Sequence, residues 1–393
     1  GGFIVITLLL LFIGGNSLIR ITNIDQSTQR VNQLSLPALD KSYELQVEFI
    51  LMSKSAQASF YTTSQDELAT IRKNFTEQKK RYDSSYQDLQ QIVSNDPKLK
   101  QSSQEVEQTY KRFAKSVDNL FKDKQTQLEL NNTLRTQLED IEISAEDANS
   151  VVLDIIDIDG LEENNSRAYQ AANNMENNFQ SVVTNSTDML TVKTLNTLDI
   201  VKNEQVYYLE EVERSLGLIR PAIIESNADL YNDLNSYVEN LVNNVRGNNS
   251  LSANKKRLID AIAQTESELA NAEKSTTEAL KQLKELVDQA TVLAFDLQQD
   301  VSGNVSTATI WTWIAMVIAT LIAIAVAAIT VSRITKPLSE VNRILDIVAS
   351  GDMTQRLDDS AKDEFGELSR SCNTLIESLR TLIQGIISRS TQL

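Results

Sequence analysis

The chain has 393 residues, a net charge of −17, no histidine and a single cysteine. The lack of histidine argues against imidazole metal sites, imidazole general bases and a phospho-accepting histidine within these residues. The acidic balance is a poor match for nucleic acid, and one cysteine cannot form a disulfide framework. We therefore expect no cofactor, no metal site, no catalytic residue and no enzyme activity in this sequence.

An apolar stretch at residues 3–13 opens the chain and continues through a glycine pair to Leu18. It is short for a membrane span and lacks preceding basic residues. The alternative is a cleaved signal peptide, whose apolar region is about as short. No small-x-small cleavage site follows before the helical pattern begins at Leu18. We expect residues 1–15 to belong to a truncated first transmembrane helix.

Residues 16–306 carry an apolar pattern that is helical almost throughout. After Pro97, apolar residues recur every three or four positions, beginning with Val106, Tyr110, Phe113 and Val117. This spacing leaves one apolar face per helix, as helix bundles require. Capping and breaking residues predict helix ends near 61–64, 94–97, 157–160, 184–188 and 247–250, with a kink or further break at 216–221.

The lengths of these helices favour one architecture. The helices after Pro97 and after Ser250 are far longer than the usual globular helix, and the second continues into a later apolar stretch. Six helices of such lengths suit two stacked four-helix bundles that share long helices. The alternative is one long coiled coil without a binding cavity, which the polar interruptions of the apolar stripes disfavour. We predict an all-α domain over residues 16–306.

Candidate ligand-binding residues are cations that interrupt the apolar stripes. Lys54, Arg72 and Lys124 each follow or adjoin apolar residues at helical spacing. A cation that faces the interior of a bundle could receive an anionic group. The alternative is that these long side chains reach solvent or pair with a nearby carboxylate. Ten carboxylates in residues 139–163 lack a calcium-loop spacing and are read as a solvated hairpin.

A second apolar stretch, residues 308–331, contains no charged side chain and is long enough to cross a bilayer as a helix. Trp311 and Trp313 stand at one end, and Arg333 and Lys336 follow the other. The positive-inside rule places these basic residues in the cytoplasm. We expect a transmembrane helix over 307–331, with residues 16–306 outside the membrane and 332–393 inside. Residues 16–306 hold 29 Lys and Arg against 45 Asp and Glu, so the outer domain carries the negative charge.

Two short amphipathic segments follow the second span. Their apolar residues alternate steps of three and four, as in heptad seams. Each seam is too short to be stable alone, so we expect assembly across a homodimer. The seams are Ile334, Leu338, Val341, Leu345 and Val348, then Phe365, Leu368, Cys372, Leu375, Leu379, Leu382 and Ile386.

The residues between and before these segments have distinct expected roles. Pro337 fits the first turn of a new helix but disrupts continuity with the span, which predicts a hinge. Gly351 can adopt positive φ where the chain leaves the first segment, and Met353 and Leu357 can pin the connector to the bundle. Carboxylates at 363 and 364 suit the N-terminus of the second helix.

This arrangement resembles the HAMP linker of chemoreceptors and sensor kinases. We assign it to residues 332–385. The resemblance implies signal-transfer roles for Pro337, Gly351, Asp352, Glu364 and Gly366. The matching residues are Pro337, Gly351-Asp352, Asp363-Glu364-x-Gly366-Glu367-Leu368 and Asn373.

The tail at 379–393 looks like the start of the signalling helix of a methyl-accepting chemotaxis protein, with residues 386–393 as its first turns. The large helical domain between two spans is similar to the helical bimodular sensor class of chemoreceptors and kinases. Members of that class are associated with small organic acids, and one branch of kinases reads a periplasmic binding protein. No ligand motif of the class matches here, and no arginine lies between Arg30 and Arg72.

The resemblance implies a multi-pass receptor of the bacterial inner membrane, with a periplasmic sensor domain and a cytoplasmic HAMP domain. It implies a homodimer, and larger receptor arrays, that bind a small metabolite (an organic acid as the best guess) or a periplasmic binding protein. The signal would pass to a chemotaxis histidine kinase and its coupling protein. The alternative is a sensor histidine kinase of a two-component system.

Overall fold

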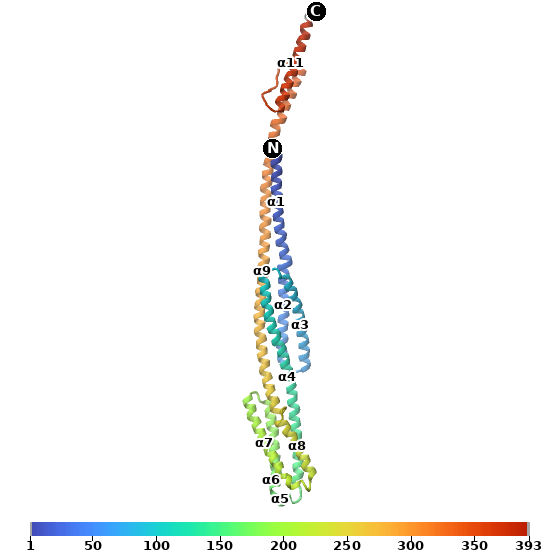
Figure 1. Cartoon of the computed structure of the whole chain (residues 1–393), viewed down its shortest axis with the longest axis vertical. Helices are drawn as coiled ribbons and strands as arrows, with labels where there is room; N and C mark the ends of the chain where they lie inside the picture. Colours follow the sequence, from blue (N-terminus) through green and yellow to red (C-terminus); the bar gives the residue numbers. More distant parts are fainter. Residues whose placement is uncertain (1, 391–393) are drawn as a thin grey trace. The chain divides into compact units, whose positions relative to one another are not determined.

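The computed structural model describes residues 2–390, and every regular element within that range is a helix (Figure 1). The chain divides into two compact units. One unit is Asn32–Ala294, which we call the sensor unit. The other joins the two ends of the chain, Gly1–Val31 and Phe295–Leu393.

The sensor unit consists of long helices joined by short turns. A π-helical turn at Val31–Ser35 lies at its start. The helices are α2 (Leu36–Tyr61), α3 (Gln65–Ile92), α4 (Pro97–Ile156), α5 (Leu161–Asn164), α6 (Ser166–Thr191), α7 (Leu195–Ile223), α8 (Ala228–Arg246) and the first part of α9 (Leu251–Thr330).

Local capping residues explain where the helices begin. The Ser64 hydroxyl accepts a hydrogen bond from the backbone N–H of Glu67 at the start of α3. The Asp96 carboxylate accepts from two backbone N–H groups at the start of α4, where Pro97 occupies the first turn. These side chains satisfy N–H groups that have no partner within the helix.

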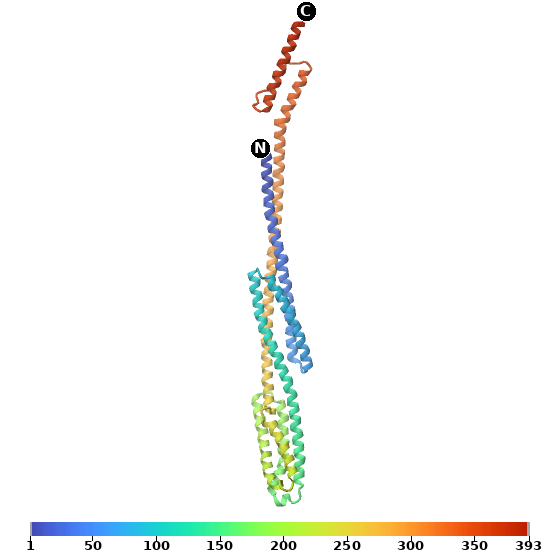
Figure 2. The ribbon, with the colours of Figure 1, turned by 45° about the vertical axis from the view of Figure 1, so that its right-hand side comes forward.

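Two separate apolar cores lie inside the sensor unit, and α4 contributes to both. The first bundle consists of α2, α3, the first half of α4 and the middle of α9, around a core that extends from Ala38 to Leu128 and from Ala272 to Ala290. The second bundle consists of the second half of α4 with α6, α7 and α8, and the first turns of α9 add Leu251 and Leu258. Both bundles are visible in the turned view (Figure 2). The predicted pair of four-helix bundles with shared long helices is confirmed.

Two predicted helix ends differ from the structure. The chain does not break at 184–188, because α6 continues to Thr191. The hydroxyls of Thr184, Ser186 and Thr187 donate to carbonyls four residues earlier, so these polar side chains are satisfied inside the helix. The further break considered at 216–221 is absent, since α7 includes Pro221 and ends at Ile223, and the alternative of a kink there stays a prediction.

The sensor unit is an internal repeat that the sequence analysis did not detect. Helices α2 and α6 both have 26 residues, and Ser166 lies 130 positions after Leu36. From Pro97 to Ala228 the spacing is 131, so α4 corresponds to α8 together with the start of α9. Buried residues recur at these spacings: Phe49 and Phe179, Met52 and Val182, Ala148 and Ala279, Val152 and Leu283, and Ile155 and Leu286.

This repeat explains how the bundles share helices. The second half of α4 completes the bundle that α6, α7 and α8 begin. The corresponding part of α9 completes the bundle that α2, α3 and α4 begin. In each repeat, therefore, the C-terminal part of the longest helix packs in the core of the bundle that the other repeat begins.

Glu107 lies beside the aromatic core of the first bundle and gives a pH-dependent prediction. Burial raises the pKa of its carboxyl, against the opposing contact of Lys111 at 3.2 Å. A carboxyl with a raised folded-state pKa favours folding most when it is protonated, and that contribution is lost as pH rises through the folded-state pKa. Glu107→Gln should therefore raise the melting temperature at pH 7.5, and the gain should shrink towards pH 4. Glu105→Gln, at an exposed position of the same helix, is the control. A gain that is equal at both pH values would contradict this.

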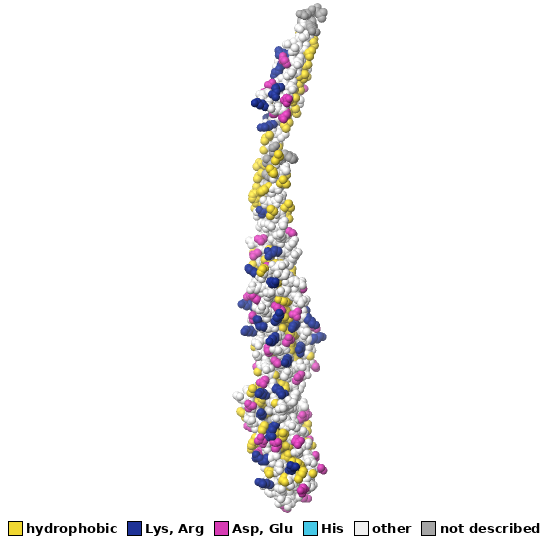
Figure 3. All heavy atoms as spheres, in the orientation of Figure 1, with side chains coloured by type: hydrophobic (Ala, Val, Ile, Leu, Met, Phe, Trp, Pro, Cys, Tyr) yellow, Lys and Arg dark blue, Asp and Glu magenta, His cyan; other side chains and the backbone are white. Residues whose placement is uncertain are grey.

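The other unit contains α1 (Gly2–Arg30) and the rest of α9, followed by a π-helical turn at Val331–Thr335, α10 (Lys336–Ala349) and α11 (Glu364–Ser390). Among the described residues, one helix is long and apolar enough to cross a membrane; its most apolar window has a mean hydropathy of 2.8 and no buried residue. Figure 3 shows apolar side chains gathered over the end of α9, whereas charged side chains cover the sensor unit. The first span over 1–15 stays a prediction, and Gly1 lies outside the described residues.

Candidate functional site

The helices α10 and α11 pack together through a small apolar core. Its residues are Val341, Ile344 and Val348 from α10, Leu357 from the connector and Ile376 from α11. Met353 packs against this core, so the predicted anchoring of the connector by Met353 and Leu357 is observed. The two most buried members, Ile344 and Ile376, did not stand out in the sequence because neither belongs to the predicted heptad seams.

Glycines determine the backbone geometry at both ends of the connector, the segment between α10 and α11. Gly351 has a φ of 100°, a conformation that L side chains rarely adopt, so the chain turns directly out of α10. At Gly366 a Cβ atom would lie 1.8 Å from the backbone oxygen of Ala361. The Asp363 carboxylate accepts a hydrogen bond from the Gly366 N–H at 3.1 Å. Glu364 opens α11, where a carboxylate suits the helix dipole.

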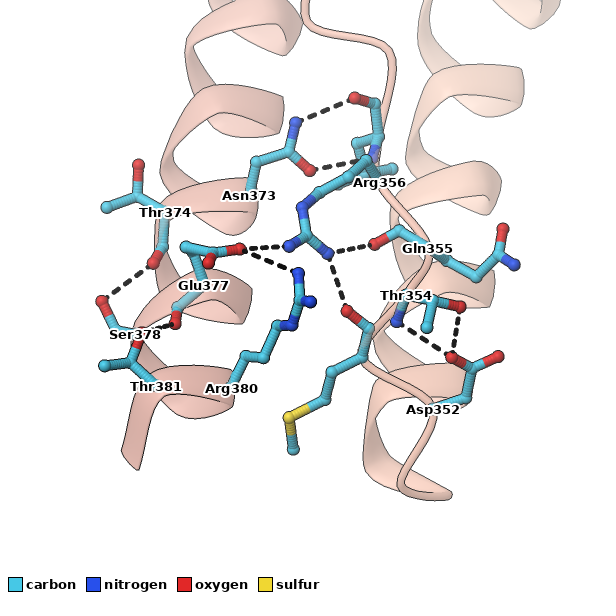
Figure 4. A network of polar contacts seen from close by, with 12 residues as sticks. Asp352, Thr354, Gln355, Arg356, Asn373, Thr374, Glu377, Ser378, Arg380 and Thr381 are labelled. Carbon is cyan, nitrogen blue, oxygen red and sulfur yellow. Dashed lines mark hydrogen bonds and ion pairs between the residues drawn. The ribbon is translucent and has the colours of Figure 1, made fainter. Parts of the chain in front are cut away.

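Polar side chains on α11 hold the connector by its backbone (Figure 4). Asn373 donates to the carbonyl of Leu357 at 2.9 Å and accepts from the N–H of the same residue at 2.8 Å. Arg370 donates to the carbonyls of Asp359 and Ala361. Asp352 accepts from the backbone and the hydroxyl of Thr354, and these bonds lower the pKa of its carboxyl.

An ionic contact adds to this attachment. Figure 4 shows Arg356 of the connector directed at Glu377 of α11, with which it forms an ion pair, while Arg380 approaches the same carboxylate at 3.9 Å. Arg356 also donates to the carbonyl of Met353 at 2.8 Å. The sequence offered no signal for Arg356, Arg370 or Glu377, because exposed charges on an amphipathic helix are common.

Part of each predicted seam remains exposed in the single chain. The residues packed inside the chain face one way, whereas another row of large apolar side chains faces solvent. These exposed residues are Ile334, Leu338, Leu368, Leu375, Leu379, Leu382 and Ile386. They continue the heptad spacing, which is the arrangement that a parallel bundle with a second copy requires.

Asn373→Ala should release the connector from α11. The substitution leaves the N–H and the carbonyl of Leu357 without partners, and each such loss costs about 1–3 kcal/mol. We expect the Leu357 amide to lose at least about tenfold in hydrogen-exchange protection. Asn373→Asp keeps the acceptor and should retain more of that protection, and Thr374→Ala should leave it unchanged. Equal protection in Asn373→Ala and the wild type would refute this role.

Pro337 occupies the first turn of α10, and the predicted disruption takes the form of a π-helical turn at Val331–Thr335. Proline has no N–H to donate and its ring displaces the preceding turn, which accounts for a widened turn before it. The same device occurs before α2, where Val31–Ser35 is π-helical and Pro37 follows.

The three predicted ligand-binding cations have different surroundings. Lys54 and Arg72 are exposed on α2 and α3. Lys124 is half-buried, and its ammonium donates to the carbonyl of Phe60 at 2.6 Å. No carboxylate pairs with it among the described residues, and burial lowers its pKa. The structure does not bring the three together, and their roles as ligand contacts stay predictions.

Lys255 has the same role in the second repeat. It lies 131 positions after Lys124 and donates to the carbonyl of Leu190 at 2.6 Å, and Leu190 lies 130 positions after Phe60. Burial lowers its pKa as well. Each lysine thus binds the last turn of the helix that precedes the α2–α3 or the α6–α7 turn.

Of the residues that the structure describes, none form a cluster of three or more metal-ligating side chains.

Comparison with known proteins agrees with the assignment of a HAMP domain after the second apolar stretch. The HAMP domain family matches residues 329–381, close to the predicted 332–385. The chain thus carries a HAMP domain after a helix that is long and apolar enough to cross a membrane. It resembles methyl-accepting chemotaxis proteins with a helical sensor domain.

Two curated relatives illustrate this resemblance. Methyl-accepting chemotaxis protein McpQ of Pseudomonas putida is 31% identical over 141 residues, which cover 34% of this chain and 21% of the relative. McpA of Bacillus subtilis is 37% identical over 73 residues, covering 19% of this chain and 11% of the relative. The matched part of the chain thus spans 21% or less of their length.

A solved structure offers a looser likeness. The sensor domain of the histidine kinase TorS of V. parahaemolyticus aligns with 64% of this chain and 99% of its own, with a TM-score of 0.46 and 12% identity. A likeness this distant carries no argument about function.

Proposed function

We propose that this chain is the sensing, membrane-spanning and HAMP part of a chemoreceptor of the bacterial inner membrane. Its periplasmic sensor unit binds a small metabolite, with an organic acid as the best guess, and the HAMP domain passes a conformational signal to a chemotaxis kinase and its coupling protein. One observation carries the proposal. The helix α9 begins in the core of the second bundle and continues unbroken to Thr330, within the matched HAMP range.

An unbroken helix supports signal transfer for a mechanical reason. A shift or rotation at one end of a helix reaches its other end, because each turn is hydrogen-bonded to the next. Ligand binding that favours one position of α9 would favour one of two packings of the HAMP helices. The π-helical turn at Val331–Thr335 is the point where that motion enters α10.

The same chain could instead drive a sensor histidine kinase, sensing directly or through a periplasmic binding protein. The two outputs are distinguished by joining residues 1–393 to the signalling hairpin of a chemoreceptor and, separately, to the catalytic region of a sensor kinase. A ligand response in membranes by the first fusion alone supports the chemoreceptor. A response by the second alone supports the kinase. If neither fusion responds to organic acids, amino acids or amines, direct sensing of these metabolites is refuted.

An exposed apolar row on α2 supports a homodimer. Leu36, Tyr43, Val47 and Ile50 are each more than two-fifths exposed. They recur at heptad-like spacing on one helix face, as at the seam between two helices. The same arrangement is seen for the exposed seam residues of α10 and α11. A second copy of this chain would cover both rows.

Val47→Cys in a Cys372→Ser background should form a disulfide-linked dimer under mild oxidation, because the two copies of Val47 meet at this seam. Lys73→Cys, on the exposed surface of α3, is the matched control and should remain largely monomeric on a non-reducing gel. Equal cross-linking of both variants would place the dimer contact elsewhere.

A further inference from the structure

A polar hollow of about 540 Å³ lies beside the α2–α3 turn, where α4 passes from the first bundle to the second. Hydroxyl, amide and cationic groups dominate its lining, and Leu128 is its one purely apolar residue. The lining residues are Thr62, Thr63, Ser64, Gln65, Asp66, Lys124, Gln127, Leu128, Asn131, Asn132 and Arg135.

The charges in this hollow are unbalanced in favour of cations. Lys124 and Arg135 contribute two positive charges against the single carboxylate of Asp66. The Lys124 ammonium has three N–H donors and uses one of them on the Phe60 carbonyl. Within residues 2–390, Arg135 has neither an ion-pair nor a hydrogen-bond partner, so its guanidinium is available to a ligand.

The second repeat provides an internal comparison. Its lysine, Lys255, makes the same bond to a helix end, so that bond alone is a structural feature of the repeat. On the turn, polar residues are retained in part: Thr63, Ser64 and Asp66 correspond to Lys193, Thr194 and Asn196, whereas Thr62 and Gln65 correspond to Val192 and Leu195. On the long helix the rest of the lining is not retained: Gln127, Leu128, Asn131, Asn132 and Arg135 correspond to Leu258, Ile259, Ile262, Ala263 and Glu266.

This divergence distinguishes residues that hold the turn in place from residues that could bind a ligand. The repeat preserves the scaffold and the lysine, whereas the remaining lining on the long helix is mostly polar with a cation in one copy and apolar with a carboxylate in the other. Polar residues at these long-helix positions are not needed to hold the turn, because the second repeat holds its turn with Ile262, Ala263 and Glu266 there. Asn131, Asn132 and Arg135 of the first copy therefore require another explanation.

We propose that the hollow beside the α2–α3 turn is a binding site for a small organic carboxylate, held between Lys124 and Arg135. A guanidinium binds a carboxylate through two parallel hydrogen bonds, and the ammonium supplies a second positive charge. Asn131 and Asn132 offer amide donors and acceptors to hydroxyl groups of the ligand. Two cations at the ends of the lining suit a dicarboxylate.

The site also suits the relay of a signal. It joins the α2–α3 turn to α4, and the Gln127 amide on the same helix donates to the carbonyl of Ala261 and the hydroxyl of Thr265 on α9. A ligand that draws the turn towards α4 would act on a helix that contacts α9 directly, and α9 continues to the HAMP domain. This role rests on the proposed function, whereas binding itself does not.

The test is titration calorimetry of the full chain in nanodiscs with succinate, with uncharged succinamide and inorganic phosphate as comparison probes. We expect saturable binding of succinate and none of succinamide. Arg135→Gln, an exposed change that removes no contact within the protein, should weaken binding by at least about tenfold, the loss expected for one charged hydrogen-bonded pair. Phosphate binding as tight as that of succinate would overturn the carboxylate assignment.

Lys124→Met and Lys255→Met form a matched pair. Both remove an ammonium from a helix-end carbonyl, so both should lower the melting temperature to a similar extent. Only Lys124→Met should abolish succinate binding. Absence of succinate binding to the wild type, wild-type binding by Arg135→Gln, or equal loss in both lysine variants would refute the site. Binding without a response of the chemoreceptor fusion would leave the site standing and refute the proposed function.

Discussion

Phe49→Ala is expected to lower the free energy of unfolding of the sensor unit by about 3–5 kcal/mol, the usual cost of removing a buried phenylalanine ring. Phe49 is fully buried and contacts three aromatic rings, with centroid distances of 4.6 Å to Phe113, 6.0 Å to Tyr82 and 6.4 Å to Tyr110. The measurement is chemical denaturation of the full chain in detergent, followed by circular dichroism.

Phe179→Ala tests whether the two bundles unfold together. Phe179 is the counterpart of Phe49 in the second repeat and is 2% exposed. Because α4 runs through both cores without a break, we expect both variants to shift one shared transition. Tyr61→Ala, at a position that is 76% exposed, should change stability by no more than about 0.5 kcal/mol. Two resolved transitions, with each variant moving one, would contradict the cooperative unit.

Gly366→Ala should displace the connector from α11 and abolish ligand response in the chemoreceptor fusion. The new Cβ atom would lie 1.8 Å from the Ala361 carbonyl oxygen, far inside van der Waals contact, so the backbone of the connector must move. Overpacking of this kind costs about 1–3 kcal/mol. Hydrogen exchange should show faster exchange over residues 351–363.

Gly385→Ala is the matched control on the same helix. No heavy atom lies within 4 Å of a Cβ atom built there, and alanine favours a helix over glycine by about 1 kcal/mol. It should therefore leave the connector in place and strengthen α11. If both glycine variants respond alike, the close approach at Gly366 does not govern the connector.

The connector could be predicted from sequence because its requirements are local. Positive φ at Gly351, the close approach at Gly366 and the anchors Met353 and Leu357 each leave a mark in residue type. The helices of the sensor unit were predictable for the same reason, since their apolar spacing and the caps at Ser64 and Asp96 are short-range signals.

Features that depend on tertiary contact could not be predicted. The rotation of a helix decides whether a cation meets a hollow or solvent. Lys54 and Arg72 interrupt apolar stripes and are exposed, and Arg135, which is also exposed, lines the polar hollow without any comparable pattern. The end of α6 was placed too early because serine and threonine suggested a break, while intrahelical bonds satisfy them.

The repeat escaped detection because burial is retained where identity is not. Phe75 and Tyr82 on α3 correspond to Gln205 and Val212 on α7, and all four are buried. A bundle core requires apolar volume at fixed helical spacing and tolerates many side chains there. Lys124 and Lys255 are a retained pair whose role becomes clear only when both helix ends are seen.

The uninterrupted passage of α4 between the two cores limits how this chain can vary. Each residue of an α-helix advances the chain by about 100° around the axis. One residue inserted between Leu128, in the first core, and Leu134, in the second, would turn every later inward-facing side chain of α4 by that angle. Length changes at this point should therefore be tolerated in steps of about seven residues, which restore the phase, and rejected otherwise.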